Sequence, residues 1–285
     1  MPVDQRRING PEVTIPYNIY FDSNAKQTET RKTLPKKRTD GRDSTELRKI
    51  FVKTGIVSQA KGSAYIEMGK TKVVCSVFDP REIPNKTGYS LQGELFCEFK
   101  FSPFSCLKRK IHQQDSEEKE YSIILQRALE SAVCRHEFPN FQVDVYALVL
   151  DNGGSSLAAA IMASSLALSD ASVPMFGLVT AVTAGIYQDR FYLDLTEEEE
   201  VICSKAPDES TSSRNYGIVI QANLPQHGQI SEFFHVGSMD LANMKPTVEA
   251  ITTACKELCP VMQQCLVKSV LKALKRKENM EKEDQ

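Results

Sequence analysis

Residues 148–160 read Leu-Val-Leu-Asp-Asn-Gly-Gly-Ser-Ser-Leu-Ala-Ala-Ala, an apolar run that enters two glycines and continues into small residues. This order predicts a buried strand, a tight turn and a helix that lies very close to a sheet. Backbone N–H groups at such a turn can bind an anion. However, no Lys or Arg occurs between Arg135 and Arg190, so this stretch lacks the cation that would complete a phosphate site.

On both sides of this turn, the spacing of apolar residues predicts further strands and helices. Before it we expect a hairpin, a strand and a helix, followed by the strand that enters the turn, over residues 63–78, 94–101, 117–135 and 141–150. After the helix at 155–170 we expect four strands, over residues 178–187, 191–195, 216–222 and 229–235. A long helix then begins near Asn243, and Pro260 should kink or break it. The order predicts an α+β fold, a mixed sheet with helices on one side.

The composition is that of an ordinary globular protein, with 285 residues, 41% apolar and 25% charged residues and a net charge of −2. This balance gives no general reason to expect nucleic acid, although local basic clusters leave it open. The N-terminus lacks the apolar core of a signal peptide, and no apolar run is long enough to cross a bilayer. We therefore expect a protein that is neither secreted nor membrane-spanning.

Eight cysteines lie mostly within apolar strand or helix patterns. Without a signal peptide, this placement favours buried thiols over disulfides. Cys255, Cys259 and Cys265 share one helical stretch, but no His lies nearby and no CxxC pair occurs. Packing in the core is therefore favoured over a zinc site.

The predicted organisation has three parts. Residues 1–40 show no sustained periodicity, and we interpret them as an extended N-terminal arm that orders against a partner, with a disordered tail as the alternative. Residues 41–274 form the folded domain, and residues 275–285 form a charged C-terminal tail that should fray into solvent.

Four motifs give the chain a family resemblance. The run of residues 55–77, Gly-Ile-Val-Ser-Gln-Ala-Lys-Gly-Ser-Ala-Tyr-Ile-Glu-Met-Gly-Lys-Thr-Lys-Val-Val-Cys-Ser-Val, resembles the opening hairpin of RNase PH-like domains. Residues 150–156, 170–175 and 194–200 resemble later landmarks of that family in the same order. The start, residues 1–8, further resembles a ring subunit of the eukaryotic RNA exosome. The resemblance covers about residues 40–274.

The resemblance implies a fold, a set of partners and a location. The fold is an RNase PH-like domain of the ribosomal protein S5 domain 2 type, β-α-β-α. The chain would take a place in a six-membered ring with other RNase PH-like subunits, under an S1-domain cap subunit, with RNA passing through the central channel. The locations implied are nucleus, nucleolus and cytoplasm.

The same resemblance provides a test for activity. Active relatives attack an RNA 3′ end with inorganic phosphate, which needs cationic donors and metal-binding carboxylates. They place an Arg in the glycine turn, where this chain has Ser156, followed by Ala159 where they have a serine. In the preceding helix, Glu130 stands where relatives often carry Arg. A serine hydroxyl cannot replace a guanidinium fork.

The metal-binding positions differ as well. Glu200 stands in the first acidic position, and Asn215 is assigned to the second, although residues 203–213 resemble an insertion that contains Asp208. We predict a non-catalytic structural subunit of the exosome ring, without catalytic residues, metal or cofactor, in which the glycine turn is structural. The acidic residues 194–200 are interpreted as a solvated surface, with a metal site as the alternative.

Two rival functions remain. One is an active phosphate-dependent 3′-to-5′ exoribonuclease that uses Glu200 and Asp208. The other is a stand-alone nucleotide-binding module, which the missing Lys and Arg disfavour.

The densest basic loop of the domain is the candidate for RNA contact. Lys100 precedes it, and Lys108, Arg109 and Lys110 lie within it. In ring relatives this loop faces the channel, which implies sequence-independent contacts with the RNA backbone. The alternative is an ordinary solvated loop.

Overall fold

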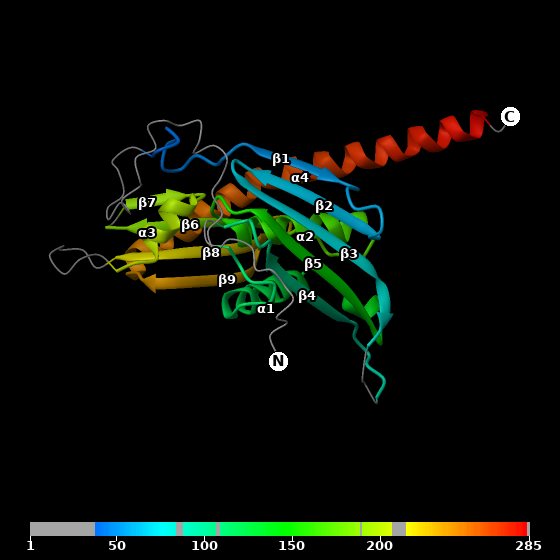
Figure 1. Cartoon of the computed structure of the whole chain (residues 1–285), viewed down its shortest axis with the longest axis horizontal. Helices are drawn as coiled ribbons and strands as arrows, with labels where there is room; N and C mark the ends of the chain where they lie inside the picture. The colour runs from blue at the N-terminus through cyan, green and yellow to red at the C-terminus, as the bar shows by residue number, and fades with distance from the viewer. Residues whose placement is uncertain (1–37, 84–87, 107–108, 189, 207–214, 284–285) are drawn as a thin grey trace, which may run out of the picture.

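The computed structural model describes residues 38–83, 88–106, 109–188, 190–206 and 215–283, and it contains two β-sheets with helices packed against them (Figure 1). The predictions for residues 1–37, Lys108 and Asp208 lie outside the described residues. In the described part of the chain, no helix is both long and apolar enough to cross a bilayer.

The first sheet has five strands in the spatial order β1-β2-β3-β5-β4. Their bounds are β1 Ile50–Thr54, β2 Gly62–Met68, β3 Thr71–Glu82, β4 Glu94–Phe101 and β5 Phe141–Asp151. β4 runs parallel to β5 and the other neighbours are antiparallel, which confirms the predicted mixed sheet. The predicted hairpin is β2–β3, in which Met68 pairs with Thr71.

The second sheet has four antiparallel strands in the order β7-β6-β8-β9. Their bounds are β6 Thr180–Tyr187, β7 Arg190–Leu193, β8 Tyr216–Leu224 and β9 Gln229–Ser238. Every residue of β6 is buried, as expected of a strand that is covered on both faces.

Helices form the remaining layers. Their bounds are α1 Ser116–Glu130, a short 3₁₀ helix Arg135–Glu137, α2 Ser156–Asp170, α3 Glu197–Cys203 and α4 Leu241–Glu283. α2 packs on β2 and β3 of the first sheet and on β6 of the second, and α1 packs on β4 and β9. α4 packs on β6 and β8, where the Thr180 hydroxyl donates to the carbonyl of Cys255 at 3.2 Å. The predicted fold class is confirmed, with the refinement that one layer of helices lies between two sheets.

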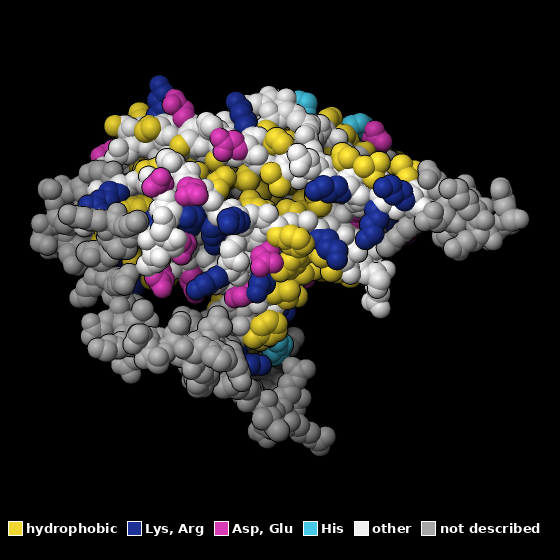
Figure 2. All heavy atoms as spheres, turned by 90° about the horizontal axis from the view of Figure 1, so that it is seen from above, with side chains coloured by type: hydrophobic (Ala, Val, Ile, Leu, Met, Phe, Trp, Pro, Cys, Tyr) yellow, Lys and Arg dark blue, Asp and Glu magenta, His cyan; other side chains and the backbone are white. Residues whose placement is uncertain are grey.

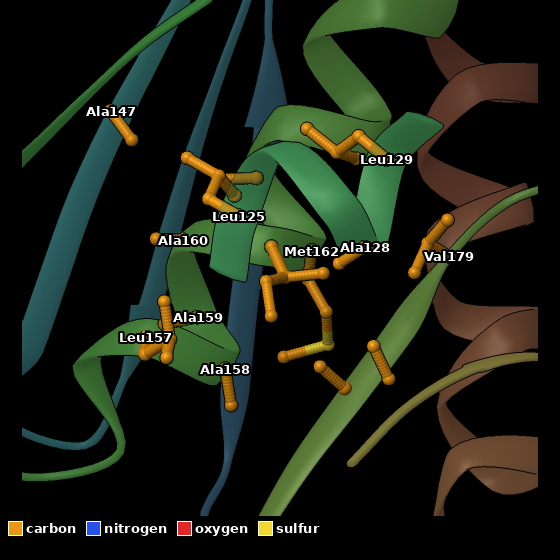
Figure 3. Packing of buried hydrophobic residues seen from close by; sticks show 14 of the residues in the cluster. Leu125, Ala128, Leu129, Ala147, Leu157, Ala158, Ala159, Ala160, Met162 and Val179 are labelled. Atoms are coloured by element: carbon orange, nitrogen blue, oxygen red, sulfur yellow. The ribbon is translucent and has the colours of Figure 1, made fainter. Parts of the chain in front are cut away.

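The core centres on α2, whose residues from Ser156 to Leu168 are all buried. Figure 3 shows Ala160 and Met162 of this helix near Leu125 and Ala128 of α1. The run of Ala and Ser lets the helix approach both sheets closely, as the sequence predicted.

α4 differs from the prediction in two ways. It is one continuous helix that contains both Pro246 and Pro260, so the expected break at Pro260 is wrong. Pro260 and Lys256, one turn earlier, are both exposed, so water can hydrate the carbonyl that lacks an N–H partner. The helix also continues to Glu283, so the expected fraying is wrong for residues 275–283, and residues 284–285 lie outside the described residues.

All eight cysteines are present as thiols without disulfides. Six are buried, and Cys106 and Cys265 are half-buried. Burial raises the pKa of Cys75 to about 12, so its reactive thiolate form is suppressed. The prediction of packed thiols is confirmed.

Candidate functional site

The glycine turn between β5 and α2 is packed against the segment that follows β7. Gly154 has a φ of +92°, and a Cβ built there would lie 2.4–2.5 Å from backbone atoms of Leu195, Thr196 and Glu197. Ser155 adopts the left-handed conformation with a φ of 55°, and its hydroxyl donates to the carbonyl of Leu195 at 3.0 Å. The glycine is therefore required by both conformation and space.

A cation does reach this turn, from a distant part of the sequence. The buried Arg48 guanidinium donates to the carbonyl of Gly153 at 2.9 Å and to that of Gly154 at 3.1 Å. It also donates to both carboxylate oxygens of Asp194, at 2.9 and 2.6 Å. The expectation that no cation stands at the turn is therefore corrected. Its donors face carbonyl and carboxylate oxygens of the fold, which leaves them committed to structure.

The anion at the turn is a side chain of the protein itself. The backbone N–H of Ser155 donates to Oε1 of Glu200 at 2.7 Å. Burial raises the pKa of Glu200 to about 7, although this hydrogen bond and the charge of Arg48 act in the opposite direction. An N–H that would face a bound phosphate at such a turn is therefore occupied by an internal carboxyl group.

Two further acids of the segment are buried, whereas Glu198 is exposed. Asp194 and Glu199 are 1% and 5% exposed. Arg38 forms two hydrogen bonds with the Glu199 carboxylate, at 2.9 and 2.7 Å, and donates to the carbonyls of Leu193 and Asp194. The interpretation of residues 194–200 as solvated is thus wrong for these two acids, because buried arginines pair with them.

The charge state of Asp194 follows from its partner. Burial alone would raise the pKa of this carboxyl, but the hydrogen bonds and charge of Arg48 outweigh burial and leave the pKa below its ordinary value. Asp194 therefore stays ionised while it holds Arg48 in place.

The other residues that the resemblance assigned to active-site positions are buried or have partners within the fold. Ser156 and Ala159 are buried in the first turn of α2. Glu130 accepts from the Gln126 amide at 3.0 Å and lies 3.7 Å from Arg135. Asn215 is buried, and its Oδ1 accepts from the N–H of Asp240 at 3.0 Å. Among the described residues, no group of three or more His, Cys, Asp and Glu side chains could hold a metal ion.

The predicted RNA-binding residues are only partly brought together. Lys100 is on β4, opposite Leu148 of β5, and Arg109 is exposed in the loop that follows. Lys110 is half-buried, with Nζ 3.1 Å from Glu117, 3.5 Å from Asp115 and 5.0 Å from the centre of the Phe101 ring. Its charge is thus partly neutralised, whereas Arg109 is open to solvent.

Sequence reasoning missed the three arginines that surround the acidic segment, Arg38, Arg42 and Arg48. All three donate to Asp194 or its carbonyl, over about 150 residues of sequence. The only signal available was a string of basic residues before β1, which reads equally well as a solvated segment. Pairing over such a distance follows from the fold alone.

Comparison with known proteins places the chain among nucleases and their relatives. The family model "3′ exoribonuclease family, domain 1" matches residues 46–174. Human "Exosome complex component MTR3" is 35% identical over 94% of this chain and 96% of its own length. The structure of rice Rrp46 covers 79% of this chain and 98% of its own, with a TM-score of 0.67 and 24% identity. An Archaeoglobus fulgidus exosome "with RNA bound to the active site" has a TM-score of 0.68 over 78% of this chain and 91% of its own, at 19% identity. Those two structures support the fold alone.

Proposed function

The chain belongs to the RNase PH-type 3′ exoribonuclease family, and from that premise we propose that it is a non-catalytic structural subunit of the core ring of an RNA exosome. In this role it holds the ring closed and lines part of the channel that delivers RNA 3′ ends to nuclease subunits. Its partners are other RNase PH-like subunits and an S1-domain cap subunit, in the nucleus, nucleolus and cytoplasm. Residues 41–274 are the domain that enters the ring.

The assembly part of the proposal rests on similarity along nearly the whole chain. The human and mouse relatives, 35% and 36% identical over 94% of this chain, are both described as exosome components. A match that extends through both sheets and α4 supports a shared surface as well as a shared fold.

The non-catalytic part rests on a single observation, the Ser155 N–H bound to Glu200. Phosphorolysis needs an anion site that inorganic phosphate can enter and cations that face its oxygens. At this turn the amide is occupied by Glu200, and the guanidinium of Arg48 is held by two carbonyls and Asp194. Ser156 adds no charge. The turn therefore supports packing and disfavours phosphate binding.

The assembled ring tests this proposal directly. The ring is incubated with RNA, inorganic phosphate and Mg²⁺, and the release of nucleoside diphosphates is compared between the wild-type chain and Glu200→Gln. Gln keeps an oxygen that accepts from Ser155, so we expect equal rates in both rings. Nucleoside diphosphate release that disappears in the Glu200→Gln ring would instead establish the rival, an active phosphate-dependent exoribonuclease.

The channel-lining part concerns Lys100, Lys108, Arg109 and Lys110. Contacts of Lys and Arg with single-stranded RNA are independent of sequence and weaken with salt, each contributing a slope of about −0.7 in log K against log salt. Replacing Lys108, Arg109 and Lys110 by Ala should therefore weaken RNA passage and flatten the salt dependence. The exposed Lys256→Ala on α4 is the matched control. Unchanged crosslinking and protected RNA lengths in the triple variant would reject RNA contact at this loop.

A further inference from the structure

The C-terminal part of α4 carries an apolar face that is largely open to solvent. The Cys265 thiol donates to the carbonyl of Val52 in β1 at 3.6 Å, and beyond that residue the helix projects away from the sheets (Figure 1). Four aliphatic side chains in this projecting part are exposed by half or more: Val267 57%, Val270 58%, Leu271 52% and Leu274 50%. Spacings of three and four residues place them on one face.

This face is distinct from the one that packs on the core. Cys255, Leu258 and Met262 are buried and mark the core-facing side of α4. At 3.6 residues per turn, the exposed stripe is rotated by roughly 120° from that side. The exposed stripe is therefore separate from the face of α4 that packs on the core.

Among the described side chains from Val267 to Lys275, the charged ones lie on one side of the stripe. Lys268, Lys272 and Lys275 are exposed, and their spacing of four and three residues forms a third face beside the aliphatic one. No Asp or Glu occurs between Leu258 and Lys277. Figure 2 shows apolar side chains flanked by Lys and Arg at the end of the molecule where α4 leaves the body.

We propose that the stripe Val267–Val270–Leu271–Leu274 docks a protein partner whose surface offers an apolar groove bordered on one side by Asp and Glu carboxylates. The aliphatic residues fill the groove as an amphipathic helix does, and the three lysines face the carboxylates. The proposal rests on the proposed function only in taking the exosome assembly as experimental material.

Other occupants fit the helix less well. A second copy of this chain, docked through the same stripe, would bring a second row of lysines beside the first, which repels. A bilayer-bound helix typically carries Trp or Phe in its apolar face, whereas the four residues of this stripe are Val and Leu. RNA binding favours aromatic platforms, and the four exposed residues are all aliphatic.

A photo-crosslink at the stripe tests the proposal. A benzophenone amino acid replaces Leu271 in the full chain, and the assembly purified from cells is irradiated. We expect one dominant crosslink to a stoichiometric protein, at an apolar segment with Asp or Glu within one helical turn or two strand residues. The same amino acid at exposed Glu257 of α4, near the body, is the control and should give at most a fifth of the yield.

Two variants then separate the apolar and the charged contributions. Val270→Asp with Leu274→Asp, both at exposed positions, should lower the crosslink yield at least about fivefold, as loss of anchor residues does. Lys268→Glu, Lys272→Glu and Lys275→Glu together should lower it about threefold at low salt and less at high salt. Lys256→Glu, outside the lysine face, should leave it unchanged.

The outcomes are distinct. A dominant crosslink to a second copy, to RNA or to lipid overturns the proposal, as does a yield no higher than that of the Glu257 control. The proposal is also overturned if the purified chain floats with phosphatidylserine vesicles and Val270→Asp/Leu274→Asp abolishes this flotation. Absence of other RNase PH-like chains from the assembly defeats the proposed function, but a crosslink to an acid-bordered apolar segment still supports this inference.

Discussion

Acids of one short segment are held in opposite ways. Asp194 and Glu199 are buried against the guanidinium groups of Arg48 and Arg38, and the pKa of Asp194 lies below its ordinary value. Glu200, the next residue after Glu199, receives a backbone N–H, and its pKa is raised to about 7. Burial raises the pKa of both carboxyls, and only Asp194 has a guanidinium partner close enough to outweigh it.

The same difference separates two roles. The arginine-paired acids form a fixed brace, here called the arginine brace (Arg38, Arg48, Asp194 and Glu199), that joins the residues before β1 to the turn and to α3. Glu200 closes the turn with one hydrogen bond and can gain or lose a proton near neutral pH. The cations of this region therefore stabilise the fold, and the turn is left with a weakly held internal acid.

Disrupting the arginine brace should have the largest effect on the free energy of unfolding. In Arg48→Met, the buried Asp194 loses its close ion pair and keeps only Arg42, 3.4 Å away, and the carbonyls of Gly153 and Gly154 each lose one donor. We expect the free energy of unfolding to fall by about 3–5 kcal/mol, measured by urea denaturation of the purified chain at pH 7.

The control is an ion pair at the surface. Lys72 lies 3.5 Å from Asp151, with both side chains at least 40% exposed. Lys72→Met should cost less than about 1 kcal/mol, because solvent screens this pair. Equal losses in the free energy of unfolding for Arg48→Met and Lys72→Met would contradict a stabilising role for the arginine brace.

Adding a methyl group at Gly154 should have the second-largest effect on the free energy of unfolding. Gly154→Ala brings a Cβ to 2.4–2.5 Å from the backbone of residues 195–197 at a φ of +92°, so the turn must separate from the acidic segment. We expect a loss of about 2–4 kcal/mol in the free energy of unfolding, from strain and overpacking together.

Gly228 supplies the matched control for conformation alone. Its φ is +65°, and a Cβ there would have no neighbour within 4 Å. Gly228→Ala should cost about 1 kcal/mol. A loss at Gly154 no greater than this would mean that close packing at the turn contributes little.

Much of the fold was predictable because it depends on local patterns. Alternation gave the β2–β3 hairpin, and the small residues after Gly154 gave a helix that packs on sheets. The continuity of α4 was missed because a proline on the exposed face can be tolerated. The second sheet was missed as a separate unit, since strand pairing between distant segments has no local signal.

The site was less predictable. That Ser156 stands where active relatives carry Arg stays a prediction from the sequence resemblance. By contrast, the run Glu197–Glu200 reads as solvated charge, because nothing in it reveals that Arg38 lies against Glu199. Long-range pairs of this kind require the two sheets to be assembled first.

Glu200→Gln should have the smallest effect, and the effect should depend on pH. Because the pKa of Glu200 is about 7 in the folded chain and about 4.3 in an unfolded one, the folded state binds more protons between these values. Its free energy of unfolding therefore falls as pH rises through this window. Gln does not titrate, so the variant should match the wild type near pH 5 and exceed it by about 1–2 kcal/mol at pH 8.

Asp194→Asn sharpens the contrast, because its acid titrates outside this range. With a lowered pKa, Asp194 is ionised in both the folded and the unfolded chain from pH 5 to pH 8, and its contribution is lost only as pH falls through the folded pKa. Asp194→Asn should thus be destabilised by the same amount at pH 5 and pH 8, while the difference for Glu200→Gln changes between them. Parallel pH profiles for the two variants in urea denaturation would show that both acids are held alike, and that the amide of Ser155 and the guanidinium of Arg48 are equivalent partners.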